Sequence, residues 1–103
     1  MSTLSTHVLD TAAGRPAAGM RIRLETRDAQ LLDEAVTDAD GRVGVIGSEQ
    51  LAVGDYQLRF DVAAYHDGFY PEVIVVFTIA DPGEHYHVPL LLSPYGFSTY
   101  RGS

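Results

Sequence analysis

The sequence predicts an all-β fold, an antiparallel sandwich or barrel. Short runs of residues, many of them alternating between polar and apolar side chains, are separated by turn residues every eight to twelve positions, which is the pattern of such folds. The 103 residues lie near the commonest domain size, and no linker, repeat or low-complexity stretch divides them. We therefore expect one domain over residues 1–103.

Eight strands are expected, at residues 4–10, 20–27, 31–37, 42–46, 56–62, 72–79, 85–92 and 96–101. The segments between them are rich in Gly, Pro and Asp, with breaks at residues 13–16, 38–41, 53–55 and 80–83. The Asp-Pro-Gly of residues 81–83, for example, suits a type II turn. Residues 61–67 (DVAAYHD) show no alternation and contain two alanines, so a single helical turn is expected there.

The composition argues against several classes of function. Fourteen acidic residues against seven basic ones give a formal charge of −7, and no nucleic-acid partner is expected because such binding depends on basic side chains that neutralise phosphates. No apolar stretch approaches the ~20 residues that a membrane helix needs, and residues 1–5 lack the features of a signal peptide. The absence of cysteine excludes disulfides and thiolate metal sites. The expected location is the cytoplasm, with no membrane partner.

Period-two alternation places chemically capable side chains opposite the core face of three strands. In the strand at 85–92, the even positions are all apolar or aromatic, and the other face carries His85 and His87. His7 in the first strand and Tyr100 in the last strand also lie opposite the predicted core face. We expect these polar faces to carry the function.

Two short motifs that suggest metal sites do not make convincing ones. His85 and His87, at i and i+2, could bind zinc with a third ligand, yet no carboxylate spacing completes the set. Residues 38–41, Asp-Ala-Asp-Gly, resemble part of a calcium loop; with Gly41 as the sixth residue, the twelfth would be Gly47, so the EF-hand pattern fails. The chain also has no G-x-S-x-G nucleophile elbow and no phosphate-binding glycine loop.

The C-terminal segment carries the most specific motif, Tyr100-Arg101-Gly102-Ser103. It would bring a phenol, a guanidinium and a terminal carboxylate beside the histidine pair. Together with five further segments, it resembles the 5-hydroxyisourate hydrolases, the enzyme branch of the transthyretin family. The matching segments are LSTHVLD at 4–10, GRPA at 14–17, TDADGR at 37–42, FYPEV at 69–73 and HYHVPLLLSPYG at 85–96.

Four positions distinguish the enzymes of this family from its hormone carriers. The carriers have lysine at the position of His7, an acidic residue at that of Arg42, and threonine at those of His87 and Tyr100; this chain has the enzyme's residue at all four. Phe97 departs from the tyrosine of many members. It falls on the core face, and we expect no functional effect.

The resemblance implies an eight-stranded transthyretin-like sandwich with one short helix, assembled as a homotetramer. In that assembly the last strand pairs with its symmetry mate, and two such dimers meet at a central channel lined by the polar faces. The implied activity is hydrolysis of 5-hydroxyisourate to 2-oxo-4-hydroxy-4-carboxy-5-ureidoimidazoline in urate catabolism. No metal or other cofactor is implied.

The resemblance also implies roles for five residues. His7 and His87 would activate water and shuttle protons, since imidazole is suited to that task near neutral pH; which of them is the base is left open. Arg42 would grip the oxygen-rich ring through paired donors, with His7 also in contact with the substrate. Tyr100 would hydrogen-bond to the substrate or stack on it. Ser103 would orient an imidazole or the water.

Simpler interpretations compete with each of these assignments. His66 is expected to be structural, and His85, at a strand start, to lie at the rim of the site. The main alternative function is a transthyretin-like carrier that binds a small molecule without turnover. A purely structural module predicts no chemical bias on the non-core faces, which the polar residues of three strands contradict.

Overall fold

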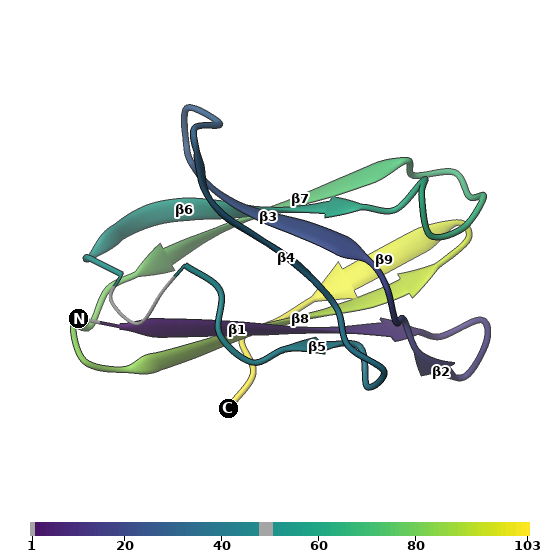
Figure 1. The fold of residues 1–103 in the computed structure, drawn as a ribbon, viewed down its shortest axis with the longest axis horizontal. Helices are drawn as coiled ribbons and strands as arrows, with labels where there is room; N and C mark the ends of the chain where they lie inside the picture. The colour runs from purple at the N-terminus through teal and green to yellow at the C-terminus, as the bar shows by residue number, and fades with distance from the viewer. Residues whose placement is uncertain (1, 48–50) are drawn as a thin grey trace.

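The computed structural model describes residues 2–47 and 51–103, and its strands form two sheets packed face to face (Figure 1). The strands are β1 (Thr3–Asp10), β2 (Arg15–Pro16), β3 (Arg21–Thr26), β4 (Leu31–Val36), β5 (Arg42–Val43), β6 (Gly54–Asp61), β7 (Glu72–Ile79), β8 (His85–Ser93) and β9 (Gly96–Thr99). One sheet has the order β2-β1-β8-β9, with β5 also paired to β1; the other has the order β4-β3-β6-β7. The eight strands expected from alternation are confirmed. The two-residue β2 forms inside a segment that was predicted to be a break.

One strand pair departs from the antiparallel pattern. β1 and β8 run parallel, in register from Thr3 opposite His85 to Asp10 opposite Leu92, whereas the other six pairs are antiparallel. Parallel neighbours need a long crossover connection. Here the four strands of the second sheet lie between β1 and β8 in the sequence. After β7 the chain is back at the end of the molecule where β1 began, so β8 can run in the same direction as β1.

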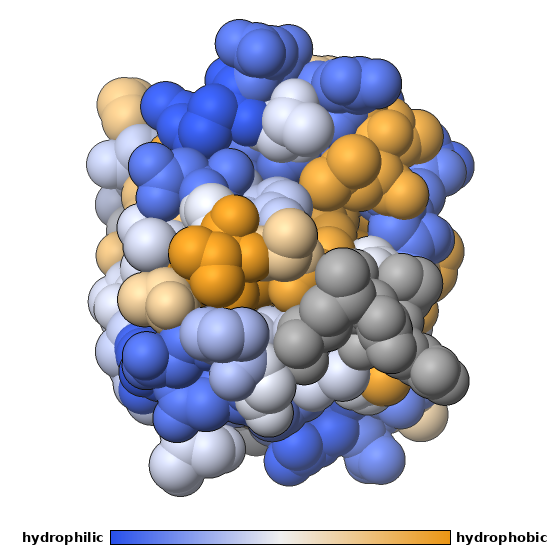
Figure 2. Space-filling model, turned by 90° about the vertical axis from the view of Figure 1, so that its left-hand side faces the viewer, coloured by the Kyte–Doolittle hydropathy of each residue, from blue (hydrophilic) through white to orange (hydrophobic). Residues whose placement is uncertain are grey.

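The core lies between the two sheets and follows the predicted alternation except in β9, where Phe97 was predicted to face the core but is 43% exposed. In β8, Tyr86, Val88, Leu90 and Leu92 are buried, and in β1 Thr6 and Val8 are fully buried, as predicted. The facing sheet contributes buried side chains from β3, β6 and β7: Ile22, Leu24, Leu58, Phe60, Val73, Val75 and Ile79. The end of the molecule at the left of Figure 1 has a mostly polar surface on which apolar residues gather in patches (Figure 2).

The predicted short helix is wrong for the described residues. Residues 61–67 form a hydrogen-bonded turn, in which the amides of Tyr65 and His66 donate to the carbonyl oxygen of Val62 at 2.9 and 3.0 Å. The hydrogen bonds of one turn do not offset the unfavourable free energy of helix nucleation. Gly68 and Pro71 follow the turn and disfavour its extension into a helix. Tertiary contacts hold the turn instead, since the Tyr65 hydroxyl donates to Asp10 Oδ2 at 2.8 Å. Among the described residues, no helix has the length and apolar character required to cross a membrane.

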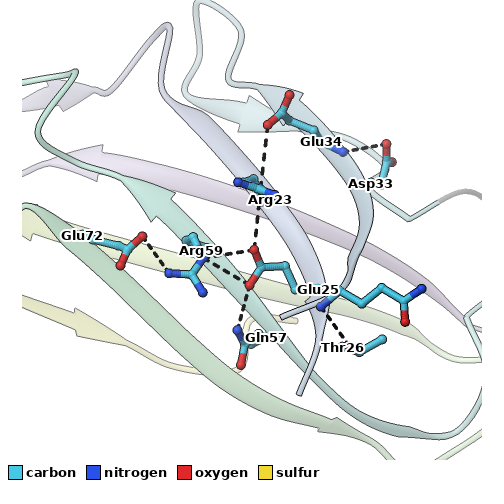
Figure 3. Close-up of polar contacts among 9 residues, drawn as sticks. Arg23, Glu25, Thr26, Asp33, Glu34, Gln57, Arg59 and Glu72 are labelled. Atoms are coloured by element: carbon cyan, nitrogen blue, oxygen red, sulfur yellow. Dashed lines mark hydrogen bonds and ion pairs between the residues drawn. The ribbon is translucent and has the colours of Figure 1, made fainter. Parts of the chain in front are cut away.

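A network of charged residues lies on the outer face of the second sheet (Figure 3). Glu25 on β3 is only 1% exposed, and both of its oxygens accept hydrogen bonds from Arg59 Nε on β6, at 3.0 and 3.1 Å. Gln57 donates to the same carboxylate at 2.7 Å, and Arg59 also bonds to Glu72 on β7. The hydrogen bonds from Arg59 lower the pKa of Glu25 and outweigh the effect of its burial. The network ties β3, β6 and β7 together on the face away from the core.

Candidate active site

The outward face of the first sheet is hollowed where β1, β5 and β8 meet the C-terminal segment. The hollow has a volume of about 310 Å³ and is lined by Ser5, Thr6, Arg42, Val43, Gly44, His85, His87 and Ser103. The end of the chain lies on the side of this sheet that faces away from the second sheet (Figure 1). Three of the five residues predicted for the site, Arg42, His87 and Ser103, therefore line one hollow.

The C-terminal segment reaches the hollow by pairing with β8. β9 ends at Thr99, two residues earlier than expected, and the Gly102 amide then donates to the carbonyl oxygen of His87 at 2.8 Å. A Cβ atom at position 102 would lie 2.4 Å from Cδ2 of the His87 ring, a separation that real structures do not contain. Glycine at this position lets the backbone lie against the imidazole and brings Ser103 to the hollow.

His7 lies next to the hollow on β1, directly opposite Arg42 on β5. Its Nε2 is 2.8 Å from the carbonyl oxygen of Asp40. A carbonyl oxygen only accepts hydrogen bonds, so Nε2 must carry a proton, and the lone pair of a neutral His7 is then on Nδ1. The Asp40 carbonyl thus fixes both the tautomer and the orientation of this ring.

His87 is held as a neutral imidazole at neutral pH. Partial burial lowers the pKa of His87 from the usual value of 6.5, and electrostatic interactions with His7, Arg42 and His85 lower it further. Its Nδ1 is 2.7 Å from the Ser5 hydroxyl. This contact leaves Nε2 as the nitrogen available to a ligand in the hollow. A neutral imidazole with a free nitrogen can accept a proton from water.

Of the two predicted site residues that do not line this hollow, His7 lies opposite Arg42, whereas Tyr100 lies at another hollow of the single chain. Its side chain is 57% exposed and lines a second hollow of about 270 Å³ between β7, β8 and the C-terminal segment. His87 borders both hollows, so the two lie on either side of this residue. Arg101 lies over the ring of Tyr86, 4.4 Å from its centroid, and 3.6 Å from Glu84.

The sequence did not point to Thr3 and Ser5, which contact the histidines directly. Ser5 Oγ lies 2.8 Å from His85 Nε2 and 2.7 Å from His87 Nδ1, and Thr3 Oγ1 lies 2.6 Å from His85 Nδ1. Alternation places Thr3, Ser5 and His7 on one face of β1. The pairing of that face with the histidines depends on the register of β1 against β8, which the sequence does not reveal.

The remaining histidine, His66, was expected to be structural, and no metal site was expected. His66 lies in the turn after β6 and its buried Nε2 has no hydrogen-bond partner among the described residues. Within residues 2–47 and 51–103, no three His, Asp or Glu side chains gather in a way that could hold a metal ion.

Comparison with known proteins identifies the family. The model of the HIUase/Transthyretin family matches residues 4–102. The chain belongs to this family. A 5-hydroxyisourate hydrolase of Caulobacter vibrioides is 45% identical over 115 aligned positions, which cover all of both chains.

Solved structures that resemble this chain include both a 5-hydroxyisourate hydrolase and a transthyretin. The structure of the Klebsiella pneumoniae 5-hydroxyisourate hydrolase matches with a TM-score of 0.89 and 36% identity, over 98% of this chain and 99% of that one. Sea bream transthyretin, in a complex with thyroxine, matches with a TM-score of 0.84 and 31% identity, over 96% and 93% of the two chains. The fold is therefore shared by both branches, and the residues of the site must distinguish them.

Proposed function

We propose that this protein hydrolyses 5-hydroxyisourate to 2-oxo-4-hydroxy-4-carboxy-5-ureidoimidazoline in urate degradation. The observation that carries the proposal is the neutral His87 imidazole, which shares one hollow with Arg42 and Ser103. The full-length similarity to 5-hydroxyisourate hydrolases supports the choice of substrate.

In the proposed reaction, His87 Nε2 accepts a proton from water as the water oxygen attacks a ring carbonyl. The Arg42 guanidinium stabilises the oxyanion that develops on that carbonyl. The ring C–N bond then breaks, and the leaving nitrogen takes the proton back from His87. The new carboxylic acid releases one proton to solvent at neutral pH.

Two further residues position the reactants in this scheme. His7, whose Nε2 is bonded to the Asp40 carbonyl, offers Nδ1 to the substrate or the water. Ser103 lines the hollow beside His87, where it orients the attacking water or the imidazole. This assignment makes His87 the base and gives His7 a binding and proton-shuttling role.

We also propose that the protein works as a homotetramer, in the cytoplasm, with Tyr100 reaching the substrate across a subunit interface. β9 is an edge strand of the first sheet, where it pairs with β8, and β7 is an edge strand of the second sheet, where it pairs with β6. Phe97, Tyr100 and Val76 expose 43–57% of their surfaces at or beside these edges. Unpaired edges and exposed aromatic residues are features of sheets that pair with another chain.

The test is the ultraviolet decay of 5-hydroxyisourate, generated in place by urate oxidase. The compound also decays spontaneously, so the expected result is acceleration in proportion to the protein concentration, with product formed at the matching rate. A carrier would instead bind the compound in a stoichiometric amount, with decay at or below the background rate. That second result would contradict the hydrolase function and favour a transthyretin-like carrier.

A further inference from the structure

The Ser5 hydroxyl lies between two imidazole rings. It is 2.7 Å from His87 Nδ1 and 2.8 Å from His85 Nε2, and the other nitrogen of His85 is 2.6 Å from Thr3 Oγ1. The parallel register accounts for this row, because Thr3 lies opposite His85 and Ser5 opposite His87. The four side chains form a continuous hydrogen-bonded row, the Thr3–His85–Ser5–His87 chain.

The number of protons in this chain allows two arrangements. A hydroxyl has one proton, so Ser5 donates to one ring and accepts from the other, and a neutral imidazole has one N–H group. In the first arrangement, His87 Nδ1–H donates to Ser5, Ser5 donates to His85 Nε2, and His85 Nδ1–H donates to Thr3; His87 Nε2 then has a lone pair. In the second, every donor and acceptor is reversed and His87 Nε2 carries a proton.

We propose that the Thr3–His85–Ser5–His87 chain relays protons between His87 and solvent during hydrolysis, with Ser5 and His85 as positioning residues. The inference rests on the proposed function. When His87 Nε2 accepts the proton of the attacking water, its Nδ1 proton passes to Ser5, the Ser5 proton passes to His85 Nε2, and the His85 Nδ1 proton passes to Thr3. Thr3 releases its own proton to solvent, and the chain is left in the second arrangement.

The return step restores the first arrangement. His87 Nε2 gives its proton to the leaving ring nitrogen, and each proton of the chain moves back by one position, with one proton taken from solvent at Thr3. Over one catalytic cycle, one proton leaves and one proton enters at Thr3, so the relay ends with the same number of protons as at the start. The remaining proton of the water stays on the carboxylic acid until that group ionises.

Burial and charge favour a relay over a simple rim position for His85. Ser5 is only 9% exposed, whereas the contact between His85 and Thr3 is exposed to solvent, so the outer end of the chain can exchange protons with water. A relay also keeps His87 neutral throughout. That matters because His7 and Arg42 lie close enough to oppose a positive charge on this ring.

The kinetic test uses His85→Gln and Ser5→Ala, which break the relay while leaving His7, Arg42 and His87 in place. We expect kcat to fall by about 10- to 100-fold, part of the effect typical of proton-transfer groups, with KM changed less than about threefold. Ser5→Thr keeps the hydroxyl and should restore most of kcat. Thr11→Val is the matched control, because Thr11 bonds only to the Leu92 carbonyl at the far end of β1, and it should behave as wild type.

A proton inventory separates a relay from a structural role. In mixtures of light and heavy water, wild-type kcat should depend on the deuterium fraction along a curve, because several protons move together, and the dependence should become linear in His85→Gln. Wild-type kcat in both His85→Gln and Ser5→Ala, or a linear inventory in the wild type, would overturn the relay.

The tautomers of His87 can be measured without turnover, so this test of the relay does not depend on the identity of the substrate. Nitrogen-15 chemical shifts of the labelled histidine rings report the tautomer of His87, and both tautomers should be populated in the wild type. Ser5→Ala should leave one tautomer of His87, since the hydroxyl that couples it to His85 is gone. Identical His87 shifts in the two proteins would contradict the relay, whether or not 5-hydroxyisourate is the substrate.

Discussion

At the scale of single residues, Gly102 controls the approach of the C-terminal segment to His87. Adding a methyl group there places a carbon 2.4 Å from the imidazole, so either the ring or the tail must move. We predict that Gly102→Ala lowers kcat/KM at least about tenfold, because a displacement of about 1 Å can cost that much. Thermal denaturation should show little change, since the tail contributes no side chain to the buried core.

Gly96→Ala is the control for this substitution. It adds the same methyl group in the same C-terminal segment, but the new carbon would meet only Ser93 Oγ, at an ordinary 3.6 Å. Equal activity of the two variants would show that close packing of the tail against His87 does not matter.

A second residue-scale prediction concerns pH. Burial and nearby positive charges lower the pKa of His87 below 6.5, and only the neutral ring accepts a proton. kcat/KM, corrected for spontaneous decay, should therefore rise with pH along a curve whose midpoint lies below 6.5 and reach a plateau by pH 7. A midpoint above 6.5 would mean that His87 is not the base, or that the assembled protein surrounds it with negative charge.

At the scale of secondary-structure elements, the alternation of polar and apolar residues was sufficient to locate the strands but not their partners. His85 and His87 could be placed on the face opposite the core from the sequence alone. Their contacts with Thr3 and Ser5 follow from the parallel pairing of β1 with β8, a long-range choice that no local pattern encodes. The helix predicted at residues 61–67 failed for the same reason, since tertiary contacts decide the form of that short segment.

The Glu25 network gives a prediction at this scale. Glu25→Gln removes a buried charge that bonds to Arg59, and leaves the guanidinium with a weaker acceptor. We expect a loss of about 2 kcal/mol in the free energy of unfolding, or about 10 °C in Tm for a domain of this size. Catalytic rates at 25 °C should change little, because the network lies on the sheet that does not form the hollow.

The pH dependence of this stability has a definite sign. The folded protein holds the pKa of Glu25 below its ordinary value of 4.5, so its contribution is present above pH 4.5 and is lost as the pH falls through the lowered value. Glu34→Gln is the control, since its carboxylate is half exposed and 3.9 Å from Arg23. If both variants unfold at the wild-type temperature at pH 7, the network is only a surface feature.

At the scale of the whole molecule, the position of Tyr100 is the main disagreement between the predicted site and the single chain. The resemblance groups Tyr100 with Arg42 and His87, whereas the two hollows of one chain separate it from Arg42. Assembly offers a physical explanation, because a second subunit can bring its own Tyr100 to the first hollow. The roles of all five predicted residues stay predictions.

The tetramer itself can be tested by light scattering during size-exclusion chromatography. Four chains of 11.2 kDa should give a mass of about 45 kDa. Tyr100→Phe should keep this mass and lose activity if the hydroxyl contacts the substrate. A mass of 11 kDa for a fully active protein would show that one chain carries the complete site, and would refute the proposal of a shared site.

The central claim is that neutral His87 activates water, and the most direct measurement is the decay of 5-hydroxyisourate with wild-type protein and with His87→Asn. Asparagine keeps a polar side chain of similar reach but accepts no proton near neutral pH. We predict that the variant keeps the fold and the oligomeric state and that kcat falls by at least about 100-fold, as expected for the loss of a general base. Wild-type turnover in a folded His87→Asn protein would contradict the claim.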